Sequence, residues 1–394
     1  MYDAVVVGCG PAGTTAAYHL AKKGLKVAAF DKEKFPRYKS CGGCVSVKGK
    51  KALGFDITDV VENTVRGITF SYKSARTLAI DSVVPIGYSV MRDSFDAFLL
   101  DKARLAGAHI LEGERVSRFT DRADSVTVET SKGVYEGLFL IGADGAASVV
   151  RRGVEDRPYT NYHISLTAEV KADKEAVERL GGRYLVDFGT IPHGYGWIFH
   201  KREGLSIGIA GLYCRVGNRI RDYFKCFVEG QDTLRGLNIG ETRGWTIPVY
   251  HGQAQRAFKG RVLVAGDAGH LVDPFLGEGI YYAIKSGQLA ASAVCAAIDG
   301  PRRDLSCYED MLRAELYGEF EASAGIERLI YNYPRIWYRI LEMNPSLMHD
   351  YYSVIRGDTG CGVFYEELSS RIRKKPWKFL RGLLGHMLNP SEAI

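Results

Sequence analysis

The sequence predicts an α/β fold, or α+β when the whole chain is counted, from three observations. An apolar strand, a glycine turn and an acid occur together at three places in the chain. Between the second and the third of these places the pattern changes to short alternating strands. After the third it becomes helical and rich in aromatic residues. We therefore expect a domain with a parallel sheet, a domain with an antiparallel sheet and a helical C-terminal region.

The first of these places lies in residues 2–31, where two apolar strands flank a helix. The glycines of a Gly-x-Gly-x-x-Gly turn are Gly8, Gly10 and Gly13. In such a turn the first glycine allows the tight bend, the second lets a pyrophosphate approach the backbone, and the third lets helix and strand pack closely. Asp31, at the end of the second strand, is expected to accept hydrogen bonds from the ribose of an adenosine.

The second place follows a buried strand that begins at Leu138, and it carries Asp144 in a glycine turn. The third is Gly266–Ile280, which separates another buried strand from a long apolar-periodic helix. Asp267 is expected to accept a hydrogen bond from a ribityl hydroxyl, and Gly279 keeps the backbone slim beside a flat ring. The free amides of the helix start there attract negative charge, such as that at the pyrimidine end of a flavin.

The order of these elements predicts domains assembled from separated segments. The two sheet types alternate along the chain, so neither domain is continuous in sequence. We expect the domain with the glycine turns to comprise residues 1–65, 88–156 and 245–300, the antiparallel-sheet domain to comprise 67–87 and 157–244, and the helical region to comprise 301–394.

Composition and charge are those of an ordinary globular protein, with 46% hydrophobic and 25% charged residues among 394. The net charge of +6 suits phosphate-bearing ligands or anionic phospholipid surfaces, and no nucleic-acid motif accompanies it. No apolar run reaches the length of a membrane span, and no signal peptide precedes the first strand. We therefore expect a cytoplasmic protein that can lie on a membrane surface.

Eight cysteines in such a protein are expected to be free thiols. Cys41 and Cys44 enclose two glycines, but no second ligand pair has the spacing of a metal site, so no metal is expected. Five others stand alone, and each is expected to be a small buried apolar residue. These are Cys214, Cys226, Cys295, Cys307 and Cys361.

Taken together, the three turns resemble those of the flavoprotein group that includes aromatic hydroxylases, flavin halogenases and geranylgeranyl reductases. The resemblance implies FAD as the cofactor, bound by a Rossmann-like domain of the hydroxylase type. Aromatic hydroxylases share the Asp144 turn, so this turn does not distinguish them from geranylgeranyl reductases.

The segment Pro192–His200 points to one member of the group. It contains Tyr195, Trp197 and Phe199, and resembles the tyrosine-x-tryptophan-x-phenylalanine signature of geranylgeranyl reductases. Alternate residues of a strand share a face, so the three rings are expected to form an aromatic wall for a polyprenyl chain. Such a wall also shelters positive charge that develops on an alkene carbon. The family pattern continues with proline where this chain has His200.

The loop Cys41-Gly42-Gly43 also matches that family, in which it lies beside the flavin. By the same resemblance, the fixed donor fork of Arg92 is offered to cofactor oxygens. The cofactor-binding residues expected from the turns and the resemblance are Gly8, Gly10, Gly13, Asp31, Cys41, Gly42, Cys44, Arg92, Val116, Asp144, Asp267, Gly279 and Ile280.

The resemblance implies an FAD-dependent reductase that saturates C=C bonds of geranylgeranyl chains in lipids. It acts by hydride transfer from reduced flavin N5 plus protonation, and its electron donor is a ferredoxin or NAD(P)H. Cys41 is a candidate proton donor or redox thiol, with ordered water as the rival acid. The expected catalytic residues are Cys41, Tyr195, Trp197 and Phe199. The alternatives are an aromatic hydroxylase, a halogenase-like enzyme and a non-catalytic electron-carrying flavoprotein.

The C-terminal tail suggests peripheral membrane contact. Between Lys374 and Leu388, helical spacing puts Trp377, Leu380, Leu384 and Met387 on one face and basic residues on the other. This pattern is typical of an interfacial helix, and equally of a terminal helix packed on its own domain. A lipid substrate favours the first interpretation.

Overall fold

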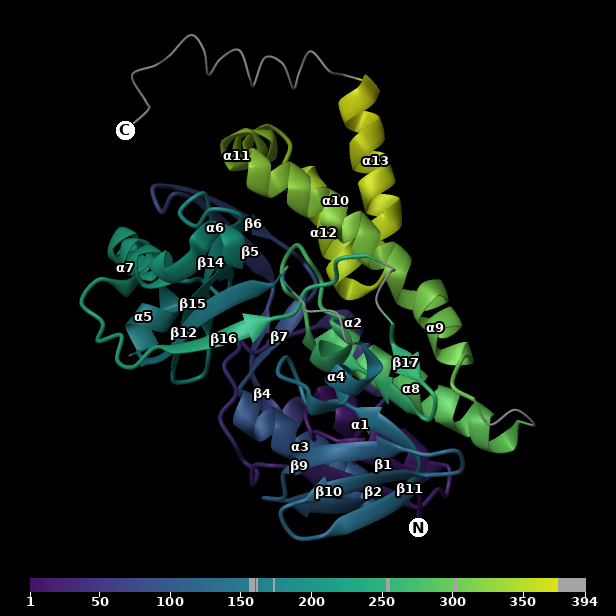
Figure 1. Cartoon of the computed structure of the whole chain (residues 1–394). Coiled ribbons are helices and arrows are strands. Elements are labelled where there is room, and N and C mark those ends of the chain that lie inside the picture. The colour runs from purple at the N-terminus through teal and green to yellow at the C-terminus, as the bar shows by residue number, and fades with distance from the viewer. Residues whose placement is uncertain (156–159, 161, 173, 253–255, 301–303, 375–394) are drawn as a thin grey trace. The chain divides into compact units, whose positions relative to one another are not determined.

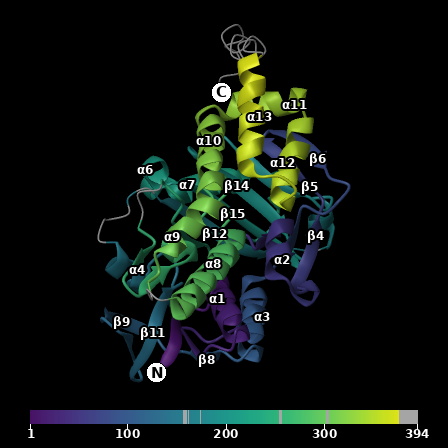
Figure 2. The same ribbon diagram turned by 90° about the vertical axis from the view of Figure 1, so that its right-hand side faces the viewer.

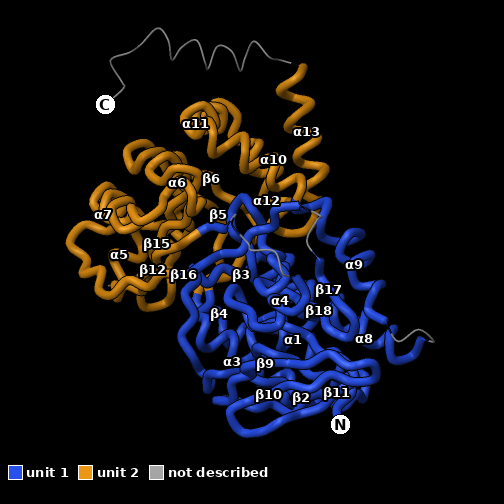
Figure 3. Tube along the Cα trace, viewed as in Figure 1, with its two compact units in different colours: residues 1–62, 90–163, 245–320 blue, residues 63–89, 164–244, 321–394 orange. Residues whose placement is uncertain are grey.

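The computed structural model describes residues 1–155, 160, 162–172, 174–252, 256–300 and 304–374 (Figure 1). The chain divides into two compact units, each built from three segments (Figure 3). Unit 1 comprises Met1–Glu62, Val90–His163 and Trp245–Phe320. Unit 2 comprises Asn63–Ser89, Ile164–Gly244 and Glu321–Ile394.

Unit 1 contains an eight-stranded sheet along the path β17-β18-β11-β1-β2-β8, with β10 paired to β11 and to β9. The pairs β18–β11, β11–β1, β1–β2 and β2–β8 are parallel, and the remainder are antiparallel. The bounds are β1 (Tyr2–Val7), β2 (Val27–Asp31), β8 (His109–Glu112), β9 (Val116–Asp121), β10 (Val126–Thr130), β11 (Val134–Gly142), β17 (Phe258–Lys259) and β18 (Val262–Val264). The parallel centre confirms the Rossmann-like prediction.

The helices of this unit are α1 (Pro11–Lys22), α2 (Val47–Leu53), α3 (Arg92–Leu105), α4 (Val149–Val154), α8 (Ile280–Asp299) and α9 (Cys307–Leu312), with short helices η1 (Thr58–Val60), η4 (Gly266–Gly269) and the π-helix η5 (Arg313–Tyr317). Helices α1 and α8 lie side by side (Figure 2). Small residues at their contact allow this approach, because a Cβ on Gly287 would collide with the carbonyl of Ala12. Glycine at position 287 is therefore required where α8 packs against α1.

Unit 2 contains a seven-stranded sheet of order β16-β12-β15-β14-β13-β5-β6. The bounds are β5 (Gly67–Tyr72), β6 (Arg76–Asp81), β12 (His163–Lys171), β13 (Tyr184–Phe188), β14 (Gly194–His200), β15 (Gly204–Leu212) and β16 (Arg243–Ile247). The sheet is antiparallel at β13–β14, β14–β15 and β5–β6, as expected from the alternating pattern, but β13 and β5 are parallel. These two strands come from chain segments more than a hundred residues apart. A separate three-stranded sheet has the order β3 (Cys44–Ser46), β7 (Gly87–Val90) and β4 (Val61–Val65).

The remaining helices are α5 (Lys174–Glu178), α6 (Tyr213–Val216), α7 (Ile220–Gly230), α10 (Gly318–Asn332), α11 (Pro334–Met343), α12 (Ser346–Arg356) and α13 (Cys361–Lys374), with η2 (Gly217–Arg219) and η3 (Asp232–Leu234). Helix α7 buries Phe224 and Phe227 against one face of the sheet, where Ile198 and Ile209 lie. No helix in the described part of the chain is long and apolar enough to cross a bilayer. The tail residues Trp377, Leu380, Leu384 and Met387 lie outside the described residues.

The cysteines are free thiols, but the prediction that the isolated ones are buried is wrong in part. Cys361 is buried and Cys295 and Cys307 are half-buried, whereas Cys214 and Cys226 are exposed. Cys226 lies between Phe224 and Phe227 of α7, whose inward rings leave it on the outer face of the helix. Local sequence does not reveal which side of an amphipathic helix a single small residue takes.

Candidate functional site

The first glycine turn has one open position among its three glycines. A Cβ on Gly8, whose φ is +96°, would collide with the carbonyl of Ala143. A Cβ on Gly13 would collide with the carbonyl of Gly8. By contrast, the atom nearest to a Cβ on Gly10 would be Nη2 of Arg37, at 3.8 Å. Gly8 and Gly13 therefore serve packing, and Gly10 leaves room for a ligand against the backbone.

Helix α1 presents its free amides to this space. Its N-cap is Gly10, no side chain caps it, and its first turn contains no acid. Pro11 occupies the first helical position, where its missing N–H costs nothing. The start of a twelve-residue helix with unsatisfied N–H groups is a site for an anion.

Arg37 lies beside the same space, and the sequence reasoning did not assign it a role. Its Nη2 forms an ion pair of 3.0 Å with Oδ2 of Asp96, and its guanidinium lies 4.8 Å from the ring centre of Phe35. Its Nη1 is buried and has no hydrogen-bond partner among the residues that the structure describes. A cation with a spare buried donor next to Gly10 fits a pyrophosphate. The signal was the arginine of the Phe-Pro-Arg sequence ahead of Cys41.

Asp31 connects the turn to the end of β2. Its Oδ2 accepts from the backbone N–H of Cys9 at 2.8 Å, and its Oδ1 accepts from that of Glu33 at 2.9 Å. Each carboxylate oxygen can accept more than one hydrogen bond, so capacity for a ribose remains. The structure thus places Gly8, Gly10 and Asp31 next to one another, as the expected adenosine site requires.

Asp144 and Val116 have structural contacts in the same unit. Oδ1 of Asp144 accepts from Oγ of Ser148 at 2.5 Å, and Oδ2 accepts from the N–H of Val149 at 2.6 Å. The carboxylate thereby holds the start of α4, and burial raises its pKa. Val116 packs in the core with Val5. Neither contact was anticipated for these two expected cofactor residues.

The third turn brings an acid to the start of α8. Oδ1 of Asp267 lies 3.7 Å from where a Cβ on Gly279 would stand. Gly279 is the N-cap of α8, Ile280 is its first residue, and no side chain caps this end. The first turn of α8 contains no acid. Asp267 and the free amides of α8 therefore form a second polar position in unit 1, suited to hydroxyls and to negative charge.

Cys41 lies next to a network of buried charged side chains. The N–H of Gly43 donates to its Sγ at 3.4 Å, and the guanidinium of Arg92 also contacts the thiol. Arg92 donates from Nε and Nη2 to the two oxygens of Asp96, both at 2.9 Å. Burial opposes the charge of Arg92, but the neighbouring carboxylate of Asp96 outweighs it and raises the pKa.

Asp96 occupies part of the donor fork of Arg92. It accepts from Nε and Nη2, is fully buried and also pairs with Arg37, and because a guanidinium has five N–H donors the binding of cofactor oxygens by Arg92 stays a prediction. Arg37, Asp96, Arg92 and Cys41 thus form one continuous set of contacts. It links the open position at Gly10 to the Cys41 loop, and Gly42 and Cys44 follow directly in that loop.

In unit 2, the aromatic residues of β14 share one face as predicted. The ring centres of Tyr195 and Trp197 are 5.8 Å apart, and those of Trp197 and Phe199 are 6.2 Å apart. From β13, Tyr184 stacks on Phe199 at 3.8 Å and Phe188 lies 6.4 Å from Tyr195. The aromatic wall is therefore larger than sequence reasoning indicated, because β13 contributes two more rings.

Trp197 is held in place from the neighbouring strand. A Cβ on Gly208 of β15 would collide with its indole ring, so glycine is required opposite it. Its Nε1 is buried and forms no hydrogen bond with any described residue. His200, where the family has proline, ends β14 in register with Leu205, so the strand runs on into a hairpin. Burial lowers the pKa of His200 and keeps its ring neutral.

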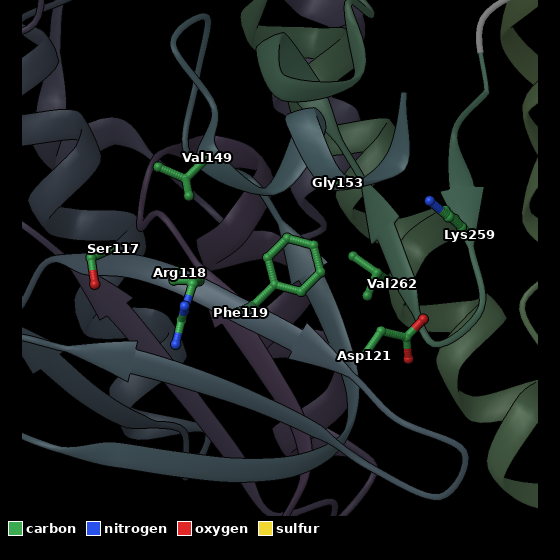
Figure 4. Close-up of a pocket in the computed structure, with 8 residues that line it drawn as sticks. All are labelled: Ser117, Arg118, Phe119, Asp121, Val149, Gly153, Lys259 and Val262. Carbon is green, nitrogen blue, oxygen red and sulfur yellow. The ribbon is translucent and has the colours of Figure 1, made fainter. Parts of the chain in front are cut away.

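A separate cavity of about 440 Å³ lies in unit 1, and Figure 4 shows it between β9, α4 and the β17–β18 hairpin. It includes no residue expected to bind the cofactor. Its lining residues are Ser117, Arg118, Phe119, Asp121, Val149, Gly153, Lys259 and Val262. Among the described residues, no group of three or more His, Cys, Asp or Glu side chains could hold a metal ion.

Comparison with known proteins identifies the family. Residues 1–179 match the family model of an FAD binding domain. A protein named digeranylgeranylglycerophospholipid reductase 2 from Methanothermobacter thermautotrophicus is 30% identical over 352 residues, covering 84% of this chain and 88% of that protein. One named geranylgeranyl diphosphate reductase from Rhodobacter capsulatus is 34% identical over 319 residues, 75% of each chain. The chain belongs to the geranylgeranyl reductase family.

Two solved structures share the fold of this chain. A geranylgeranyl bacteriochlorophyll reductase-like protein from Thermoplasma acidophilum has a TM-score of 0.75 at 23% identity, covering 84% of this chain and 87% of that one. A flavin-dependent brominase has the same TM-score at 20% identity, covering 95% and 99%. At these identities the likeness shows the fold alone.

The predicted cofactor, FAD, is confirmed, and the protein is an FAD-dependent oxidoreductase of the geranylgeranyl reductase family. The residues present fit FAD. The open backbone at Gly10, the unpartnered Nη1 of Arg37 and the uncapped start of α1 suit its pyrophosphate. Asp267 and the uncapped start of α8 suit the ribityl chain and the flavin.

Proposed function

We propose that this reductase saturates C=C bonds in the geranylgeranyl chains of lipids. The observation that carries the proposal is the aromatic wall of β13 and β14 in unit 2. Its rings line one face of the sheet, with Tyr195 and Phe199 half-buried and the other three buried, and such an apolar face suits a flexible polyprenyl chain. The names of the relatives from Methanothermobacter and Rhodobacter support the same substrate class.

The chemistry needs a proton as well as an electron pair. Bound FAD, once reduced, supplies a hydride from N5. An isolated trisubstituted alkene is electron-rich, so it accepts that hydride only if a proton arrives with it or before it. Positive charge then develops on the second alkene carbon, and the faces of Trp197 and Tyr195 are suited to stabilise it.

The residues of unit 1 have three roles in this proposal. Arg37 and the start of α1 bind the pyrophosphate, and Asp267 with the start of α8 orients the flavin end. Cys41 holds a proton at Sγ, where the N–H of Gly43 and the guanidinium of Arg92 fix the position of the sulfur. We further propose that the electrons come from a ferredoxin or from NAD(P)H.

The decisive experiment is anaerobic incubation of the FAD-loaded protein with dithionite and a geranylgeranyl lipid, followed by mass spectrometry. We expect the lipid to gain the mass of one H2 for each bond saturated. If the lipid is unchanged, and an aromatic compound gains one oxygen atom in a parallel aerobic incubation with NAD(P)H, the protein is instead a hydroxylase. The absence of any product in both incubations, although the bound flavin can be reduced, would indicate an electron carrier.

A further inference from the structure

Lys39 is a cation close to the predicted FAD-binding residues of unit 1. It lies two residues before Cys41, and it is half-buried. Its Nζ stands 4.0 Å from the ring centre of Trp245, at the start of the third segment of unit 1. Apart from this ring, the ammonium has no hydrogen-bond or ion-pair partner among the described residues.

The ionisable groups around Lys39 come from three separate parts of the chain. In decreasing order of effect they are Asp267, Arg92, Cys41 and Asp96. Asp96 is already neutralised by Arg37 and Arg92. Burial lowers the pKa of Lys39 to about 8, and Asp267 opposes that effect most strongly. A cation removed from water without an ion pair is destabilised until an anion binds beside it.

The position of Lys39 distinguishes two possible anions within FAD. The pyrophosphate has its own donors at the start of α1 and at Nη1 of Arg37. Among the charged groups, Asp267 instead has the largest effect on the pKa of Lys39, and its Oδ1 lies 3.7 Å from where a Cβ on Gly279 would stand, at the start of α8. The ammonium therefore belongs to the flavin end of the site.

We propose that Lys39, held by the ring of Trp245, faces the flavin of bound FAD and stabilises the negative charge of its reduced form. Reduction by two electrons and one proton adds one negative charge to the flavin ring system. A fixed cation favours that product over the uncharged oxidised ring, so it raises the reduction potential. The proposal rests on FAD binding and does not depend on which substrate is reduced.

The test is the reduction potential of bound FAD, measured by equilibration with a reference dye during anaerobic dithionite titration. In Lys39→Met, we expect the ratio of reduced to oxidised FAD at a fixed potential to fall about tenfold, a drop of about 30 mV for a two-electron couple. Lys39→Arg keeps the charge and should stay near the parent value. Trp245→Leu releases the ammonium and should give a smaller drop in the same direction.

The matched control is Lys32→Met, because Lys32 is an exposed lysine in the same unit and its loss changes the net charge equally. An unchanged potential in Lys39→Met would overturn the proposal. So would equal weakening of the binding of oxidised and reduced FAD, which would assign Lys39 to the pyrophosphate. If Lys39→Met does not retain FAD, the potential of Trp245→Leu decides, and an unchanged value there would also overturn the proposal.

Discussion

At the scale of single residues, the glycines of the first turn differ in what they can tolerate. A side chain on Gly13 would meet the backbone of Gly8, whereas one on Gly10 points into open space. We therefore expect Gly10→Val to fold with a melting temperature near that of the parent but to lose FAD, because the side chain occupies the place of the pyrophosphate. Flavin absorbance after purification measures the loss. Full flavin retention in a folded variant would remove Gly10 from the site.

Cys41 can be tested by its nearest isostere. Serine keeps the size of the side chain, but its hydroxyl is a much weaker acid than a thiol. If Sγ delivers the proton, Cys41→Ser should lower lipid turnover at least tenfold while dithionite still reduces the bound FAD. The measurement pairs steady-state turnover with anaerobic reduction in the same sample. Unaltered turnover would leave Cys41 a packing role only, and would favour ordered water as the acid.

At the scale of elements, substitutions on the two faces of the sheet in unit 2 can distinguish an effect on substrate binding from an effect on stability. Trp197 lies on the aromatic face of β14, and Phe227 of α7 packs on the opposite face. Truncating either buried ring costs roughly 3–5 kcal/mol of unfolding free energy. We expect only Trp197→Ala to raise the KM for the lipid, with FAD binding unaffected. Phe227→Ala is the control, and equal KM effects in both variants would mean that the wall does not bind the lipid.

Element boundaries followed from the sequence wherever strand, glycine turn and helix occur in order. Within residues 2–31 the expected strand, glycine turn, helix and second strand form in that order, because the apolar runs and the turn mark their ends. Pairings between distant segments were not accessible in this way. The local sequence pattern does not predict that β5 pairs in parallel with β13. It also does not predict that Tyr184 and Phe188 belong to the aromatic wall.

In the candidate site too, local features could be predicted from the sequence and contacts between distant residues could not. The spacing of glycine turns and of the acids at strand ends is visible in the sequence, so Gly10, Asp31 and Asp267 could be predicted as cofactor-binding residues. The charged network could not, because whether Arg92 serves a ligand or Asp96 depends on how a helix is rotated. Arg37 was missed for the same reason, although its neighbours in the loop had been noticed.

At the scale of the whole molecule, the C-terminal tail bears on how the protein reaches its lipid. We propose peripheral membrane contact through residues 374–388, with basic side chains at the head groups and an apolar face in the acyl boundary. Each basic residue near an anionic surface contributes about 1 kcal/mol, so binding should weaken with salt. Vesicle flotation should recover the full chain with anionic vesicles, and should recover less of a folded chain that ends at Arg373. Equal recovery of the two would exclude the tail.

The alternation of segments also has a consequence for how the chain is made. The polypeptide passes between the two units at 62/63, 89/90, 163/164, 244/245 and 320/321. The central strand β1 can pair with β11 only after residues 134–142 have been synthesised. Strand β11 can pair with β18 only after residues 262–264 have been synthesised. While the ribosome is still adding the intervening residues, β10 covers the first part of one edge of β11, but residues 140–142 on that edge have no strand partner. The newborn chain is therefore most exposed to aggregation midway through translation, and chaperones that shield exposed strand edges would protect it most at that stage.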